Sequence, residues 1–122
     1  MILVEPSVWI RYLSNRAPFA NTLDQILDNE EALGHEFIFG ELLVGDNGGR
    51  TALLSSYALI PHLNRLPHSE VVEFARSRKL LGLGIGWIDI HLLAATIVAK
   101  AQLYTADQRL FEVAKSLGVA HV

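Results

Sequence analysis

The chain has 122 residues, 51% of them hydrophobic, and a formal net charge of −3, so we expect one compact domain over residues 1–122 with a sizeable core. It has no cysteine, which excludes a disulfide scaffold, a cysteine nucleophile and a thiolate metal site. No uncharged apolar stretch reaches the length of about 18 residues that a membrane span needs, and no leader peptide is predicted. We therefore expect a soluble, cytoplasmic protein that makes no contact with membranes.

The first half of the chain alternates short apolar runs with helical patterns. Residues 2–4 form an uninterrupted apolar run, which predicts a strand buried on both faces. Pro6 favours the start of a helix that continues to Leu13, because the missing N–H of proline is no loss in a first turn. Further elements are expected in this half: helices at about 19–29, 36–44 and 51–58, and a short strand at 32–35. Residues 59–63 fit a strand or a loop equally well.

The second half continues this alternation. The expected elements are a helix at 69–81 capped by Ser69, a glycine-rich turn at 82–86, a helix at 87–100, a strand at 102–105, a helix at 107–117 and a strand at 118–120. Strands that alternate with helices predict an α/β fold with a mainly parallel sheet covered on both faces. In such sheets ligands bind just outside the carboxyl ends of the strands, so functional residues are expected there.

Two carboxylates directly follow predicted strands. Glu5 comes after the first strand, and although it could cap the next helix, glutamate is a poor cap and Ser7 could serve instead. Asp107 follows the strand at 102–105 and is also well placed to cap the last helix. Each residue therefore has a structural interpretation beside the functional one.

Two more carboxylates lie within apolar helices. Glu41 interrupts an apolar helix, so we expect it to lie partly inside the protein, where an unpaired charge costs several kcal/mol. Asp89 lies near the start of its helix, where favourable alignment with the helix dipole is the alternative explanation, worth about 1 kcal/mol or less.

Taken together, the four carboxylates predict a cation site. Acids brought close together repel one another unless cations intervene, and ligand sets made only of oxygen favour hard ions such as Mg²⁺ or Mn²⁺. Such ions can support phosphodiester hydrolysis. With a net charge of −3, binding of a nucleic acid would also need local basic residues; the candidates are Arg11, Arg16, Arg76, Arg78 and Lys79.

Four segments resemble, in order and spacing, the VapC-type PIN-domain toxins. They are residues 2–10, which contain Glu5-Pro6-Ser7, residues 40–42, residues 84–94, which contain Gly86-Trp87-Ile88-Asp89, and residues 103–110, which contain Thr105-Ala106-Asp107. The resemblance implies a three-layer α/β/α PIN fold and a Mg²⁺- or Mn²⁺-dependent endoribonuclease that acts on RNA, often tRNA, and stops translation. It implies that Glu5, Asp89 and Asp107 gather the metal and that Glu41 completes the cluster. A homodimer inhibited by a VapB-type antitoxin is also implied.

This chain departs from the family pattern at one position, because the family has aspartate where Glu5 stands. The extra methylene moves the carboxylate outward by about 1.5 Å, and Mg²⁺ tolerates displaced ligands badly. We therefore expect weakened metal binding or turnover.

Two other functions fit part of the pattern. A catalytically silent PIN-like module could bind RNA or an antitoxin without cutting. A receiver-type phosphoacceptor domain also gathers acids at strand ends, but it needs an acidic pair after the first strand and a lysine after the last, and this chain has neither.

Overall fold

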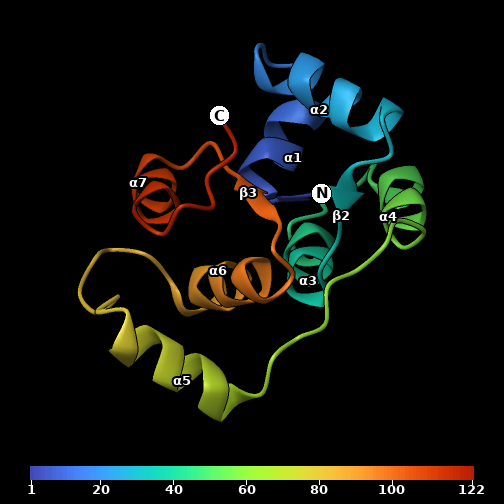
Figure 1. The fold of residues 1–122 in the computed structure, drawn as a ribbon. Helices are drawn as coiled ribbons and strands as arrows, with labels where there is room; N and C mark the ends of the chain where they lie inside the picture. Colours follow the sequence, from blue (N-terminus) through green and yellow to red (C-terminus); the bar gives the residue numbers. More distant parts are fainter.

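The computed structural model describes residues 1–122, and a small parallel sheet lies at its centre (Figure 1). The sheet has three strands: β1 (Ile2–Val4), β2 (Ala32–Leu33) and β3 (Gln102–Tyr104). Their order is β2-β1-β3, and both neighbours run parallel to β1. Ile2 lies opposite Ala32 on one side and Gln102 on the other. This register brings the carboxyl ends of β1 and β3 to the same edge of the sheet.

Helices cover both faces of the sheet. They are α1 (Pro6–Leu13), α2 (Phe19–Asp28), α3 (Glu36–Val44), α4 (Thr51–Tyr57), α5 (His68–Ser77), α6 (Trp87–Val98) and α7 (Gln108–Ser116). In Figure 1, α1 and α2 lie above the strands and α3 and α6 lie below them. This arrangement confirms the predicted α/β fold with a parallel sheet between helical layers. No helix combines the length and the apolar character that crossing a membrane requires.

The core forms where the strands meet the helices on either side. Leu3 and Val4 of β1, Leu103 of β3, and Leu92 and Leu93 of α6 have no exposed surface. Strands covered on both faces need apolar side chains at every position, which explains the uninterrupted run in β1.

The structure differs from the prediction at the last strand, which is reduced to a single parallel bridge between Ala120 and Leu103. The segment at 59–63, which fitted a strand or a loop, contributes a single bridge between His62 and Gly34. Helix α5 begins at His68 after Pro67, and no side chain caps it. Ser69 is not the cap because it already lies inside the first turn.

Candidate active site

Glu5 lies at the point where β1 passes into α1. Its backbone N–H donates to the carbonyl of Tyr104, 2.9 Å away, so the chain is still attached to β3 at this residue. Its side chain caps α1, since Oε1 accepts a hydrogen bond from the backbone N–H of Ser7 at 3.1 Å. Of the two possible caps, Glu5 rather than Ser7 is the one found. Pro6 follows at the first helical position, where the fixed backbone of proline favours the turn.

Two hydroxyl groups hold the carboxylate of Glu5 against β3. The hydroxyls of Ser7 and Thr105 both donate to Oε1 of Glu5, the second at 2.8 Å. Ser7 Oγ also accepts from the backbone N–H of Ala106 at 2.9 Å. Only 8% of Glu5 is exposed. Burial therefore raises the pKa of Glu5, the hydrogen bonds from Ser7 and Thr105 lower it, and the negative charge of Asp89 adds a smaller increase.

Asp107 is joined to the same network through Thr105. Its backbone N–H donates to Thr105 Oγ1 at 3.0 Å, and its own Oδ1 accepts from the backbone N–H of Leu110 at 3.0 Å. Asp107 is thus the N-cap of α7, as predicted. The capping bond occupies Oδ1 and leaves Oδ2 without a hydrogen-bond partner. A structural role and a ligand role are compatible in this residue.

Asp89 lies in the first turn of α6, after the glycine-rich turn. Its Oδ2 accepts a hydrogen bond from the backbone N–H of Gly86 at 3.2 Å. Burial raises the pKa of Asp89, the bond from Gly86 lowers it, and the charge of Asp107 raises it further. The turn itself needs a glycine at position 84, where φ is +79° and the Arg109 side chain occupies the space of a Cβ. Arg109 of α7 therefore packs on the loop that positions Asp89.

Glu41 differs from its prediction. It is exposed rather than partly inside the protein, because α3 buries only one side, and the neighbouring Leu43 and Val44 are 51% and 87% exposed. Loss of hydration raises the pKa of Glu41, and the negative charge of Asp89 raises it further. Glu41 thus lies within electrostatic reach of Asp89 but in an exposed position.

The comparisons with known proteins agree with this architecture. A sequence model of the PIN domain matches residues 2–116. The chain belongs to the PIN-domain family. It is 36% identical over 121 residues to Ribonuclease VapC32 of two Mycobacterium tuberculosis strains, CDC 1551 / Oshkosh and ATCC 25618 / H37Rv, over 98% of this chain and 95% of that protein. This near-complete match confirms the resemblance to VapC-type PIN toxins.

A solved structure supports the fold alone. The crystal structure of PAE2754 from Pyrobaculum aerophilum aligns with this PIN domain at a TM-score of 0.57 and 17% sequence identity. The alignment covers 91% of this chain and 77% of that one.

The side chains of this PIN domain suit a hard divalent cation in their chemistry. The structure contains one salt bridge, between Arg65 and Glu36, so no lysine or arginine neutralises any of the four acids. Glu5, Asp89 and Asp107 each keep one carboxylate oxygen without a hydrogen-bond partner. However, no three acidic or histidine side chains lie close enough together to form a complete metal-binding group. The carboxylate oxygens are the right type of ligand for such an ion, but the side chains are too far apart to form a complete metal-binding group.

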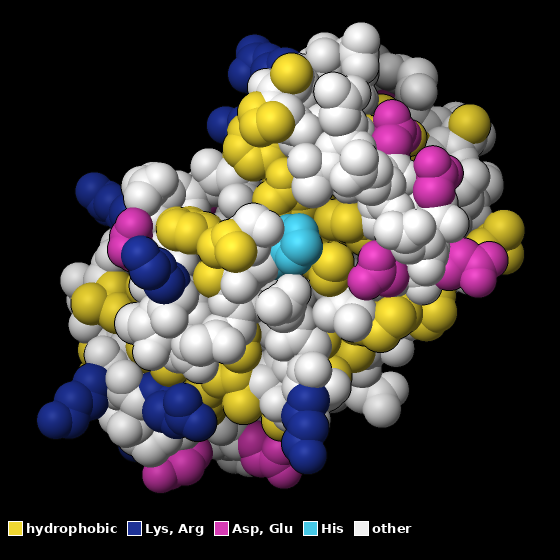
Figure 2. All heavy atoms as spheres, turned by 45° about the horizontal axis from the view of Figure 1, so that its top comes forward, with side chains coloured by type: hydrophobic (Ala, Val, Ile, Leu, Met, Phe, Trp, Pro, Cys, Tyr) yellow, Lys and Arg dark blue, Asp and Glu magenta, His cyan; other side chains and the backbone are white.

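Charge is unevenly distributed over this PIN domain. The right-hand part of Figure 2 shows Asp and Glu side chains but no Lys or Arg, and the basic side chains lie at the left and bottom. In the sequence, the acids of α2 and the following turn, residues 24–31, contrast with Arg76, Arg78 and Lys79 at the end of α5. A polyanion that approaches the end of α5 therefore meets less electrostatic repulsion than one that approaches the acidic residues 24–31.

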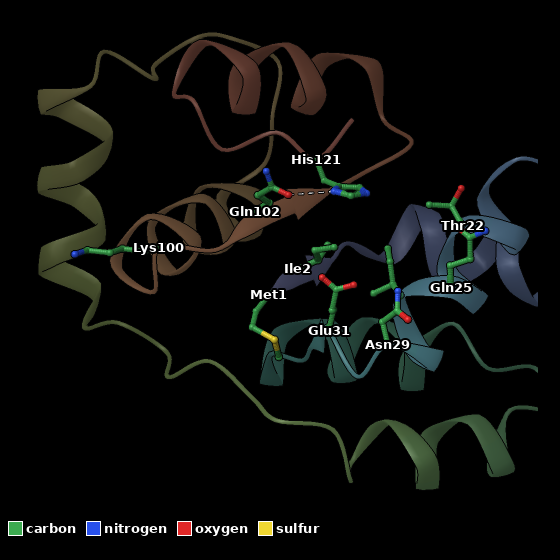
Figure 3. Close-up of a pocket in the computed structure, with 10 residues that line it drawn as sticks. Met1, Ile2, Thr22, Gln25, Asn29, Glu31, Lys100, Gln102 and His121 are labelled. Atoms are coloured by element: carbon green, nitrogen blue, oxygen red, sulfur yellow. Dashed lines mark hydrogen bonds between the residues drawn. The ribbon is translucent and has the colours of Figure 1, made fainter.

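A separate cavity of about 450 Å³ lies at the opposite edge of the sheet. Figure 3 shows residues from the amino ends of the strands, among them Ile2 and Gln102, with His121 hydrogen-bonded to Gln102 at 3.1 Å. None of the four acids lines it. Because parallel sheets bind ligands at their carboxyl ends, we do not assign the activity to this cavity.

The sequence prediction missed Thr105 and Arg109 as parts of the site, and considered Ser7 only as a possible cap. The signal for the two hydroxyl residues was their spacing, since Ser7 stands two residues after Glu5 and Thr105 two residues before Asp107. The spacing of Thr105 does not indicate its contact with Glu5, because that contact joins residues 100 positions apart.

Proposed function

We propose that this protein is a metal-dependent endoribonuclease toxin that hydrolyses phosphodiester bonds in RNA. One observation carries the proposal: Glu5, Asp89 and Asp107 come from three different elements to one edge of the sheet, and none is paired with a cation. We propose these three residues as ligands of Mg²⁺ or Mn²⁺, with Glu41 completing the cluster from α3. When bound, such an ion activates a water molecule and stabilises the departing oxygen.

The protein supplies the orientation of these ligands. Ser7 and Thr105 fix Oε1 of Glu5, so that only Oε2 is free for an ion or substrate. Gly86 and Leu110 fix one oxygen each of Asp89 and Asp107 in the same manner. Side chains held in place beforehand lose less conformational entropy when a ligand binds.

We also propose that Glu5 weakens the activity. The side chain is one methylene longer than the aspartate of the family pattern, and its Oε1 is drawn back toward Ser7 and Thr105. A ligand displaced by about one bond length suits the strict octahedral geometry of Mg²⁺ poorly.

The proposed partners follow from the similarity to Ribonuclease VapC32. They are an RNA substrate, with tRNA as the first class to test, and a VapB-type antitoxin that inhibits the toxin. A homodimer acting in the cytoplasm is part of the same proposal.

A second candidate function rests on a specific observation. No three acids are gathered into a metal-binding group, which favours a catalytically silent module that binds RNA or antitoxin without cutting. Such a module has no metal site, so Mn²⁺ titration should give no heat that depends on Asp89.

The deciding experiment compares Asp89→Asn with the unaltered protein on total RNA in the presence of Mn²⁺. We expect cleavage to fall at least about 100-fold, as for loss of a group that stabilises the transition state, and the Mn²⁺ binding heat to fall as well. Asp28→Asn, an exposed acid at the end of α2, serves as the matched control and should cleave normally. Undiminished cleavage by Asp89→Asn would show that Asp89 is no ligand. The silent module would be favoured if the unaltered protein cleaves no RNA and gives the same Mn²⁺ binding heat as Asp89→Asn.

A further inference from the structure

A cavity of about 310 Å³ lies beside the first turn of α6. Five residues with aromatic or cationic side chains line it: Phe37, Arg65, His68, Trp87 and His91. Its volume is at the lower end of the range for small-ligand pockets, about 300 to 1,000 Å³. We call this cavity the aromatic pocket.

The rings of the aromatic pocket contact one another in a chain. The imidazole of His91 stands edge-on to the ring of Trp87 at 4.8 Å and to the ring of Phe37 at 4.9 Å. His68 contacts Trp87 from α5, with centroids 5.3 Å apart. Trp87 remains 42% exposed, although a large aromatic ring on a soluble protein is usually more buried than this. The pocket therefore presents the exposed ring of Trp87, which is held in place by its contact with the buried His91.

His91 supplies a second observation. It is only 4% exposed, and its Nδ1 is buried without a hydrogen-bond partner. A buried polar atom without a partner is costly, so its position beside the pocket calls for a physical explanation.

The rim of the aromatic pocket carries positive charge. The Arg65 guanidinium lies 5.9 Å from the centroid of Phe37 and is paired with Glu36 at 3.1 Å. Both side chains of that pair are 57% exposed, so the pair is weak and a phosphate group can compete for Arg65.

Helix geometry connects the aromatic pocket with the acidic site. Trp87 and His91 are four residues apart and share one face of α6, whereas Asp89 points to the other side. Phe37 and Glu41 share one face of α3 in the same way, one turn or about 5.4 Å apart along the axis. Both line a neighbouring cavity of about 540 Å³. A strand bound at Glu41 therefore reaches the aromatic pocket by way of Phe37.

We propose that the aromatic pocket binds one unstacked nucleobase of a single-stranded RNA substrate, stacked on Trp87. Single-stranded RNA is recognised by stacking of splayed bases on aromatic side chains and by hydrogen bonds to base edges. Trp87 provides the stacking surface, the His91 ring lines the pocket beside it, and Arg65 provides a cation for the adjoining phosphate. This inference rests on the proposed ribonuclease function and adds a specificity-determining site to it.

The test uses the full chain carrying Asp89→Asn, so that RNA is bound but not cut, and a short single-stranded RNA as the probe. The protein has two tryptophans, and Trp9 is only 2% exposed, so quenching of tryptophan fluorescence by RNA reports on Trp87. We expect Trp87→Ala to weaken RNA binding between about fivefold and about 100-fold, the range for loss of one stacked base. Trp87→Phe should keep the affinity within about threefold while losing the quenching. Leu59→Ala, at a residue 86% exposed outside the pocket, should change neither.

Circular dichroism first establishes that each variant is folded. Unchanged RNA affinity in folded Trp87→Ala would overturn the inference. The same result together with loss of dimers in light scattering would assign the pocket to a contact between two copies of the chain. If the protein without Asp89→Asn cleaves RNA while Trp87→Ala binds RNA normally, only the base pocket fails. If the protein with neither substitution fails both to bind and to cleave RNA, the proposed function itself fails.

Discussion

Replacement of Thr105 by valine tests the network that joins Glu5 to Asp107. The two side chains have the same shape, so the change removes a hydroxyl without opening a cavity. Thr105 is only 6% exposed, and its hydroxyl donates to Glu5 Oε1 at 2.8 Å and accepts from the N–H of Asp107 at 3.0 Å. A hydrogen bond to a charged group contributes about 1.5 to 3 kcal/mol, and a buried donor left unpaired costs about 1 to 3 kcal/mol.

Glu5 keeps its hydrogen bonds from Ser7, and Asp107 is exposed enough for water to replace part of the loss. We therefore expect Thr105→Val to lower the free energy of unfolding by about 2 to 4 kcal/mol. Urea denaturation at neutral pH measures this change, with the m-value checked for constancy. We also expect slower RNA cleavage, since Glu5 loses one of the groups that orient it.

A matched control is available in α6. Thr96 is fully buried, but its hydroxyl donates only to the carbonyl of Leu92, at 2.6 Å. This carbonyl lies one turn back in the same helix, so Thr96→Val should cost less than about 1 kcal/mol. Thr105→Ser, which keeps the hydroxyl, should restore most of the cleavage. Equal stability of Thr105→Val and the unaltered protein would refute the assigned role of Thr105.

Three further results are expected. Glu5→Asp should increase the RNA cleavage rate, because the shorter side chain restores the ligand position of the family; an equal or lower rate contradicts this. Glu5 should stabilise the metal-free protein more, relative to Glu5→Gln, as the pH falls toward the ordinary pKa of a glutamate, because burial raises the pKa of Glu5 and the folded state then binds the proton more tightly than the unfolded chain. That gain disappears as the pH rises through the folded pKa, and urea titrations of Glu5→Gln should show a flatter dependence. Gly84→Ala should lower the free energy of unfolding by at least about 1 to 2 kcal/mol, measured by thermal unfolding. The backbone φ is +79° at this position, and the Arg109 side chain occupies the space that a Cβ would need. Gly40→Ala, whose Cβ meets no atom within 4 Å, should be neutral or stabilising.

Local patterns were sufficient to predict the secondary structure around the site. The apolar run of β1, the proline that opens α1 and the aspartate that caps α7 are signals within a few residues, and each is found in the structure. The helix boundaries agree closely for α3, which was expected at 36–44 and spans Glu36–Val44. Elements whose existence depends on a distant partner were predicted less well. The segment at 118–120 pairs only at Ala120, because the extent of pairing depends on the edge of β3 and not on the segment itself.

The exposure of Glu41 shows the same limit. An apolar sequence around this acid indicated burial on most sides, but α3 packs against the core mainly through Ile38 and Leu42. Leu43 and Val44 of the same helix are exposed. A sequence pattern gives the composition of a helix face, whereas the neighbours that cover this face are set by the whole fold.

The sequence by itself determined the four acids, their placement after strands or at helix starts, and the likeness to VapC-type PIN toxins. These depend on residue type and short-range spacing, which the order of amino acids states directly. Only the tertiary structure decided that Thr105 and Ser7 hold Glu5, that Arg109 packs on the Gly84 turn, and that Trp87 and His91 form a pocket with Phe37. The contacts of Thr105 with Glu5, of Arg109 with Gly84 and of Phe37 with His91 join residues far apart in the chain, so they arise from the parallel pairing of β1 with β3 and the packing of the helices around it.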